Sequence, residues 1–111
     1  MTGYDPDEPD EPSRSAIDHY PGPLVLHFGA RWCGYCRAAD PAIARQAARH
    51  PEVTLIRIED GPGKPLGRSF AVKLWPTLVF LRDGVEKARA VRPEEKEIAE
   101  GFYAIVEGAS P

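Results

Sequence analysis

The stretch PLVLHFGARWCGYCRAADP, residues 23–41, joins an apolar run directly to a pair of cysteines and to an Ala- and Arg-rich segment. The apolar run covers residues 23–30, and its length and composition are typical of a strand that is buried on both faces. Cys33 and Cys36, the two cysteines of the chain, follow it at once. We therefore expect the cysteine pair to lie where a buried strand passes into a helix.

Residues 34–50 predict an amphipathic helix, because apolar side chains such as Ala39 and Ile43 recur at four-residue spacing. Pro41 lies within this segment, and proline has no N–H to donate inside a helix. Two interpretations stay open from the residues alone. Either Asp40 caps a second helix that begins at Pro41, or one helix is kinked there.

The rest of the chain predicts a second set of strands and helices. Residues 53–58 alternate in the manner of a strand, and a short helix around 66–70 follows a break rich in Gly and Pro. Residues 77–91 predict an antiparallel hairpin around the turn dipeptide Asp83-Gly84, and residues 93–108 carry the start and stop signals of a last helix. A βαβ unit followed by a ββα unit predicts an α/β fold, a mixed sheet with helices on both faces.

Charge is distributed unevenly along the chain. The formal net charge is −3, yet residues 1–13 contain five acidic residues and no Lys or Arg, so the remainder carries a small positive excess. These first residues also alternate acids with prolines and offer little to bury, so we expect 1–13 to be a disordered tail. An acidic docking arm is the alternative for this segment. Residues 14–111 are then long enough for one domain.

Composition argues against several classes of function. The nearly neutral body has no basic stripe of the kind that binds nucleic acid. No window approaches the roughly 18 apolar residues that span a bilayer, and the N-terminus has no signal-peptide pattern, so we expect a cytoplasmic protein that does not bind membranes. Cytosolic thiols are kept reduced, which disfavours a lasting structural disulfide between the cysteines.

A metal site is another alternative for the cysteine pair. A tetrahedral zinc site needs four ligands, and Cys33 with Cys36 supplies only two. His27 lies inside the strand run, and His19 and His50 lie at the ends of predicted elements. We therefore expect no metal and no cofactor.

A redox-active dithiol fits the position of the pair. If the helix begins near Gly34, Cys33 lies at its N-terminus, where unpaired N–H groups and the positive end of the helix dipole stabilise a thiolate. Cys36 lies one helical turn further on, within reach of the Cys33 sulfur. Cys33 can then attack a disulfide, and Cys36 can resolve the mixed disulfide that forms.

The chain resembles the thioredoxin superfamily over residues 23–108, because a C-x-x-C pair beside a βαβ pattern is the dithiol motif of that family. FGARWCGYC resembles the family's active-site stretch, with Trp32 before the first cysteine and Gly34 after it. FAVKLWPTLVFLRDG is similar to the family's second signature. The resemblance implies that Pro41 kinks one continuous helix and that Pro76 is a cis-proline facing the dithiol. It also implies a thioredoxin fold whose N-terminal strand is missing or degenerate, which leaves a central four-stranded sheet.

The same resemblance implies a substrate-binding site. Trp32 lines it, and Trp75 and Pro76 hold an extended substrate segment, with the backbone of Trp75 pairing to it. A plain core role is the alternative for Trp75. Arg92 stands where the family has a small glycine in its docking face, which indicates a narrower or differently charged set of partners.

Other positions also depart from the family pattern. Tyr35 stands where typical thioredoxins have proline, and we expect Gly34 and Tyr35 together to tune the redox potential. His27 replaces the family's buried carboxylate, and it either passes a proton to Cys36 or is a packed strand histidine without a chemical role. Arg57 lies near the family's lysine, and we expect it to be a solvated charge at a strand end.

The leading hypothesis is a monomeric thiol–disulfide oxidoreductase that reduces protein disulfides and contributes to cell redox homeostasis. Its partners are disulfide-containing proteins and a reducing partner such as a thioredoxin reductase or a small thiol. One alternative is a thiol oxidase or disulfide isomerase, which Tyr35 favours. Another is a binding module of the same fold whose cysteines only sense redox state.

Overall fold

A computed structural model describes residues 11–106 of the 111-residue chain. Within that range helices and strands follow one another in the order expected from the sequence, with one short helix added at the start. The elements are α1 (Arg14–Asp18), β1 (Pro23–Gly29), α2 (Gly34–Arg49), β2 (Thr54–Glu59), α3 (Pro65–Ser69), β3 (Thr77–Arg82), β4 (Val85–Val91) and α4 (Glu95–Ile105).

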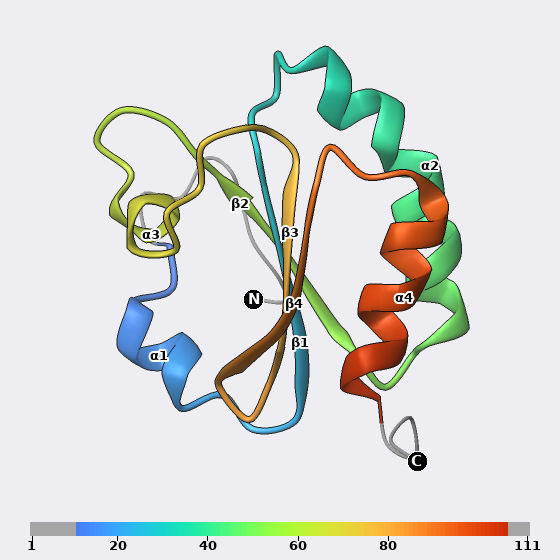
Figure 1. Ribbon diagram of the computed structural model, residues 1–111. Coiled ribbons are helices and arrows are strands. Elements are labelled where there is room, and N and C mark those ends of the chain that lie inside the picture. The colour runs from blue at the N-terminus through green and yellow to red at the C-terminus, as the bar shows by residue number, and fades with distance from the viewer. Residues whose placement is uncertain (1–10, 107–111) are drawn as a thin grey trace.

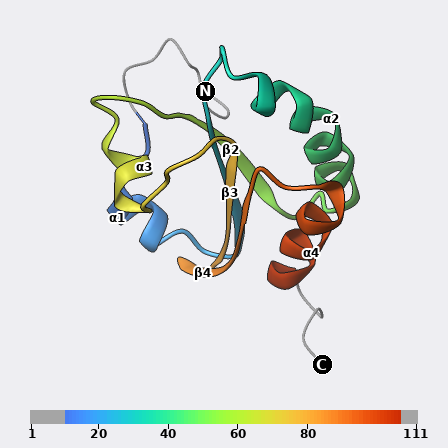
Figure 2. The ribbon, with the colours of Figure 1, turned by 45° about the horizontal axis from the view of Figure 1, so that its top comes forward.

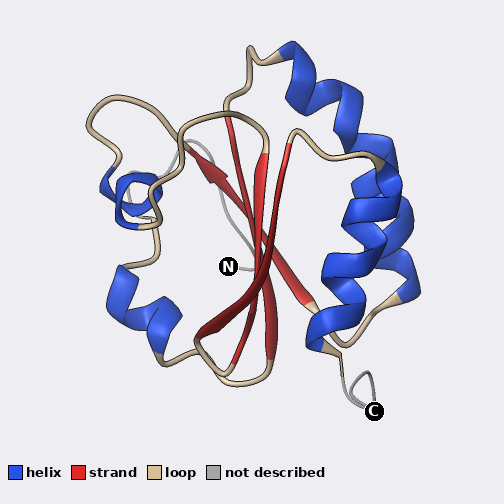
Figure 3. Ribbon diagram, viewed as in Figure 1, coloured by secondary structure: helices blue, strands red, loops and turns tan. Residues whose placement is uncertain are grey.

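The four strands form one mixed sheet in the order β2-β1-β3-β4 (Figures 1 and 3). β1 pairs with β2 in parallel and with β3 antiparallel, and β3 pairs with β4 antiparallel. This confirms the α/β fold with a mixed four-stranded sheet. Between residues 11 and 106, no strand precedes β1.

Helices cover both faces of the sheet, and each face has its own apolar core. Figures 1 and 2 show α2 and α4 side by side on one face and α1 and α3 on the other. Phe80 and Phe102 meet edge-on in the core under α2 and α4, with ring centroids 5.6 Å apart. Phe28 and Phe70 pack at 5.8 Å in the core under α1 and α3. β1, whose residues are buried from Leu24 onward, separates the two cores as the apolar run predicts.

Pro41 lies inside α2, which continues from Gly34 to Arg49 without a break. The one-helix interpretation is therefore confirmed, and Asp40 does not cap a second helix. The helix is held to the sheet on both sides of the proline, since Cys36, Ile43 and Gln46 are its buried residues.

The hairpin turn and the start of the last helix are each explained by a few neighbouring residues. Asp83 and Gly84 both have positive φ, 51° and 79°, as a two-residue type I′ turn requires, so the predicted hairpin is confirmed. α4 begins after Glu94, whose backbone N–H donates to the Glu97 carboxylate at 2.8 Å, and it ends at Ile105. The predicted stop signal at residue 108 lies outside the described residues.

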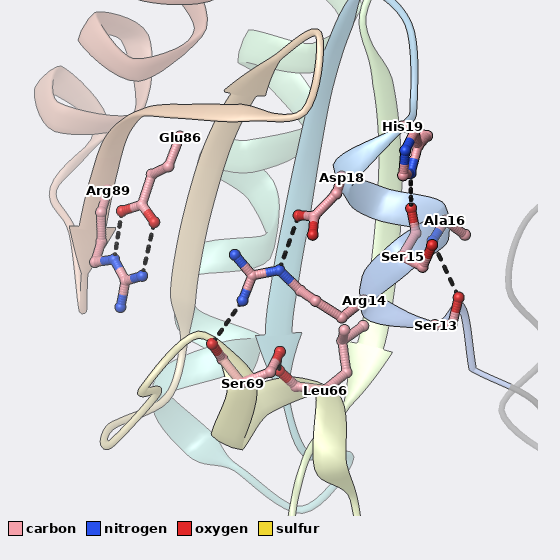
Figure 4. Close-up of polar contacts among 10 residues, drawn as sticks. All are labelled: Ser13, Arg14, Ser15, Ala16, Asp18, His19, Leu66, Ser69, Glu86 and Arg89. Carbon is pink, nitrogen blue, oxygen red and sulfur yellow. Dashed lines mark hydrogen bonds and ion pairs between the residues drawn. The ribbon is translucent and has the colours of Figure 1, made fainter.

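The helix that sequence patterns did not predict, α1, begins where the Ser13 hydroxyl accepts the N–H of Ala16 at 3.0 Å. Figure 4 shows Arg14 reaching from α1 to Asp18 and to the Ser69 carbonyl at the end of α3. The expected tail over 1–13 lies mostly outside the described residues. Of its last three residues, Glu11 accepts the N–H of Leu66, and Ser13 caps α1.

Candidate active site

Three chain segments meet at one end of the sheet, the upper end in Figure 1. The register explains this, because Phe28 near the end of β1 pairs with Thr77 at the start of β3, and Thr77 pairs with Val91 at the end of β4. The loop from β1 to α2, the loop before β3 and the residue after β4 must therefore lie together. Arg92 donates its backbone N–H to the Pro76 carbonyl at 2.9 Å, which joins the last two.

The two cysteines lie at the start of α2, as the sequence predicts. Cys33 is the residue that caps the helix, and its Sγ accepts the backbone N–H of Cys36 at 3.2 Å. Both are free thiols, and both are almost fully buried, in a small cluster with Ala30 and half-buried Trp75. The first turn of α2 contains no acidic residue, so its N–H groups and dipole act on the Cys33 sulfur without a competing carboxylate.

The two thiols have different environments. Burial, followed by the hydrogen bond with Cys33, raises the pKa of Cys36 to about 11. At neutral pH Cys36 therefore remains a thiol. Cys33 instead occupies the helix N-terminus, where its sulfur accepts a backbone N–H. This asymmetry is what a nucleophile and a resolving thiol require.

The loop before β3 faces the thiols. The Trp75–Pro76 peptide bond is cis, and the Trp75 carbonyl oxygen lies 4.0 Å from Cys33 Sγ. The Trp75 indole donates to Asp60 at 2.9 Å, which fixes the ring beside the cysteines. Trp32 meets that ring edge-on at 5.3 Å and is itself 71% exposed. The structure thus brings Trp32, Trp75 and Pro76 together around Cys33.

A cavity of about 340 Å³ lies behind Cys36, and His27, Gly29 and Arg57 contribute to its lining. His27 is 2% exposed, and its Nδ1 is buried without a hydrogen-bond partner among the described residues. Burial, helped by the positive charge of Arg57, lowers the pKa of His27 to about 4. The imidazole is therefore neutral at physiological pH and lies close to the Cys36 thiol.

Gly29 explains how the two groups approach each other. A Cβ placed on Gly29 would lie 2.8 Å from Cys36 Sγ and 3.9 Å from His27 Nε2. The glycine therefore separates the sulfur from the imidazole by the smallest side chain available.

Arg57 is a solvated charge, as expected, but it also has a partner. Its side chain is 60% exposed, and its Nη2 lies 3.3 Å from Asp40 Oδ1, so the two residues form an ion pair at the surface. The reason is geometric: Arg57 pairs with His27 across β1 and β2, which directs it toward the face that α2 covers. Sequence comparison with the family's lysine gave no indication of Asp40 as its partner.

A second hollow, of about 460 Å³, lies in front of Cys33. Trp32 and Tyr35 are exposed there, and the hollow is also lined by Lys73, Leu74 and Arg92. We call it the Cys33 groove, lined by Trp32, Cys33, Gly34, Tyr35, Lys73, Leu74, Trp75 and Arg92. Sequence reasoning did not identify Lys73, Leu74 or Asp60 as neighbours of the site. The sequence gives only a weak signal for them: Lys73 and Leu74 come just before Trp75, and Asp60 comes just after β2.

Within residues 11–106, no group of three or more His, Cys, Asp or Glu side chains is placed to hold a metal ion. No described helix is long and apolar enough to cross a membrane.

Comparison with known proteins points to one family. The sequence profile of the Thioredoxin family matches residues 10–103. Thioredoxin H-type 1 of Nicotiana tabacum is 33% identical over 88 residues, which cover 79% of this chain and 68% of that protein. Thioredoxin of Chlamydia pneumoniae is 36% identical over 76 residues, 68% of this chain and 74% of that protein.

A solved structure gives the same result. The reduced form of thioredoxin 2 from Pseudomonas aeruginosa PAO1 is 50% identical, covers 86% of this chain and 89% of its own, and superposes with a TM-score of 0.75. Thioredoxins are protein-disulfide oxidoreductases, and the C-x-x-C pair on which that chemistry depends is present here at the start of α2. The chain therefore belongs to the thioredoxin family and is a thiol–disulfide oxidoreductase.

Proposed function

We propose that this chain reduces disulfide bonds in proteins, with Cys33 as nucleophile and Cys36 as resolving thiol. The observation that carries this assignment is the position of Cys33 at the cap of α2, where its sulfur accepts the Cys36 N–H and faces the Trp75 carbonyl. Cys36 lies behind it, protonated at neutral pH. A cytoplasmic or other reducing compartment is the setting that this proposal assumes.

The first step is attack by the Cys33 thiolate on one sulfur of the substrate disulfide. The substrate S–S bond breaks, a Cys33–substrate disulfide forms, and the departing sulfur leaves as a thiolate that takes up a proton. Cys36 then loses its proton and attacks Cys33 Sγ, which releases the second substrate sulfur. The substrate gains two electrons, and the enzyme is left with a Cys33–Cys36 disulfide. A thioredoxin reductase or a small thiol would restore the dithiol.

We assign substrate binding to the Cys33 groove. Trp32 offers an exposed ring, and the cis peptide bond at Pro76 places the Trp75 carbonyl beside Cys33. An extended substrate segment can pair with that backbone as an added strand does. Gly34 and Tyr35 lie between the cysteines, where they influence the relative stability of the thiolate and the disulfide.

His27 is proposed to assist the second step. Its neutral imidazole can accept a proton from Cys36, but a pKa of about 4 makes it too weak a base to keep that proton at pH 7. It would therefore pass the proton on to water in the adjoining cavity. A His27→Leu variant should resolve a preformed mixed disulfide more slowly and with a changed pH profile. An unchanged pH profile would leave His27 with a packing role only.

Trapping tests the roles of the two thiols. Cys36→Ser, mixed with a disulfide-containing protein such as insulin, should accumulate a covalent adduct that dithiothreitol releases, because attack proceeds without resolution. Cys33→Ser is the matched control and should form none. Adducts on Cys33→Ser and none on Cys36→Ser would reverse the assignment, and turnover of insulin by the wild type separates an enzyme from a redox-sensing module.

The direction of electron flow has its own test. Equilibration with glutathione buffers measures the reduction potential of the pair. A value of about −270 mV is expected for a reductant, whereas one of about −120 mV is typical of a strong thiol oxidase. The second result would overturn the reductive direction without affecting the assignment of the cysteines.

A further inference from the structure

Arg92 connects the two sides of the Cys33 groove. Its Nε donates to the Trp75 carbonyl at 2.9 Å, and its guanidinium carbon lies 4.0 Å from the centre of the Tyr35 ring. The Trp75 carbonyl is the same oxygen that lies 4.0 Å from Cys33 Sγ. The guanidinium is therefore a fixed positive charge beside the reacting sulfur.

The backbone of Arg92 makes this placement notable. Its φ is 47°, in the left-handed region that glycine adopts without penalty and other L-residues adopt only at a conformational cost. A glycine would fit the backbone better, so the side chain is present despite a local conformational cost.

The charge of the groove has one sign. Of the residues that line it, Lys73 and Arg92 are cationic and none is acidic. The neighbouring carboxylate of Asp60 is engaged by the Trp75 indole at 2.9 Å. Both cations are exposed, so a substrate segment that enters the groove meets positive charge close to Cys33.

The guanidinium is also able to bind a carboxylate. Its carbon lies over the Tyr35 ring, and the residue is exposed, so the N–H groups that Trp75 does not use are accessible to a ligand. Nε is used by Trp75, and within residues 11–106 the Nη groups donate to no other acceptor. An Arg edge of this kind matches a carboxylate in geometry as well as in charge.

We propose that Arg92, assisted by Lys73, makes this enzyme select disulfide substrates that carry Asp or Glu next to the attacked cysteine. This specificity rests on the proposed function, since it concerns substrate bound in the Cys33 groove. A rim charge acts mainly on the rate of productive encounter, and its effect decreases as salt screens it. The preference should therefore be seen in the second-order rate constant and should decline with ionic strength.

The test compares two disulfide peptides that differ only in having Glu or Lys beside the cysteine. Pre-reduced protein is mixed with each peptide in single-turnover reactions, and the products are quantified by chromatography. The wild type should react roughly three to ten times faster with the Glu peptide at low salt. Arg92→Gln should bring this ratio close to one, and Lys73→Gln should reduce it partly.

Arg49→Gln is the matched control, because Arg49 is exposed at the opposite end of α2 from the cysteines and the substitution removes the same charge. It should retain the wild-type ratio. The proposal is overturned if Arg92→Gln retains the full ratio, or if Arg49→Gln lowers it equally. A third peptide with Gln beside the cysteine is the neutral reference. If the wild type reduces none of the three peptides, the result counts against the proposed function instead.

Discussion

His27 links the burial of one residue to the pH dependence of stability. Its pKa is lowered from 6.5 to about 4 in the folded protein, chiefly by burial and then by Arg57, while Asp40 opposes the shift. Between those two pH values the unfolded chain binds a proton that the folded chain does not, so the free energy of unfolding decreases as the pH falls. The imidazole should therefore lower stability by about 3 kcal/mol as the pH drops from 7 to 4.

Urea unfolding at a series of pH values checks this expectation. His27→Leu should remove most of the decline between pH 6.5 and 4, whatever its effect on stability at pH 7. His19→Asn is the control, because His19 is exposed, and it should leave the decline in place. Wild-type and His27→Leu curves that run parallel would show that His27 does not cause the pH dependence.

Gly29 provides a second residue-scale prediction. Gly29→Ala would place a methyl group against Cys36 Sγ, so the strand or the helix must shift, at a cost of about 1–3 kcal/mol. A Cβ on Gly34, one of the neighbouring glycines, meets no atom within 4 Å. Gly34→Ala should therefore not lower the free energy of unfolding, whereas Gly29→Ala should lower it. Equal stabilities in urea would show that the Cys36 sulfur can move aside at no cost.

The residues of the site were predictable to different extents. Cys33 and Cys36 were predictable from their spacing between a strand and a helix. A residue at the start of a helix contacts the free N–H groups there whatever the rest of the fold does. The contact of Arg92 with Tyr35 depends on the pairing register of β4, which sets the residue that follows the strand beside the loop before β3. It depends also on the left-handed backbone at Arg92. Register and backbone conformation of this kind leave no periodic trace in the sequence.

At the scale of elements, α4 packs on the sheet through a glycine. A Cβ on Gly101 would overlap the ring of Phe80 in β3. Helix propensity alone predicts that Gly101→Ala stabilises the protein by up to about 1 kcal/mol. The overlap predicts the opposite sign, a loss of about 1–3 kcal/mol, because the helix must move away from the sheet.

The sign of the change in unfolding free energy decides between the two effects. Glu100 is exposed in the same helix, and the pair Glu100→Ala and Glu100→Gly measures helix propensity there without a contact to the sheet. The difference in unfolding free energy between Glu100→Ala and Glu100→Gly is the gain that helix propensity alone provides. If Gly101→Ala stabilises the protein by that same amount, the close packing of α4 on Phe80 has no energetic consequence.

Element prediction succeeded where a pattern repeats and failed where it does not. The strands and α4 have several periodic residues each, whereas α1 has five residues and one buried side chain, Ile17. One apolar residue defines no period, so α1 depends on its contacts with the core. For α2, Pro41 is compatible with either one helix or two. One helix forms because residues on both sides of the proline are buried, and sequence patterns do not reveal that burial.

At the scale of the whole molecule, the start of the described chain closes one face of the fold. Ile17 is 2% exposed in the core with Phe28, Leu66 and Phe70. Arg14 lies 3.9 Å from the Phe70 ring centre and donates to the Ser69 carbonyl at 2.7 Å. This N-terminal segment therefore holds α3, which leads into the loop that carries the cis peptide bond.

Two shortened chains test how much the first described residues contribute. One begins at Glu11 and the other at Arg14, so only the second lacks the Glu11 contact with the Leu66 N–H and the Ser13 cap of α1. A lost N-cap costs about 1 kcal/mol, and a lost hydrogen bond to a charged group costs about 1.5–3 kcal/mol. The chain that begins at Arg14 should thus be about 2–4 kcal/mol less stable in urea. Chains that unfold at the same urea concentration would show that residues 11–13 add nothing to the fold, and that the domain begins at Arg14.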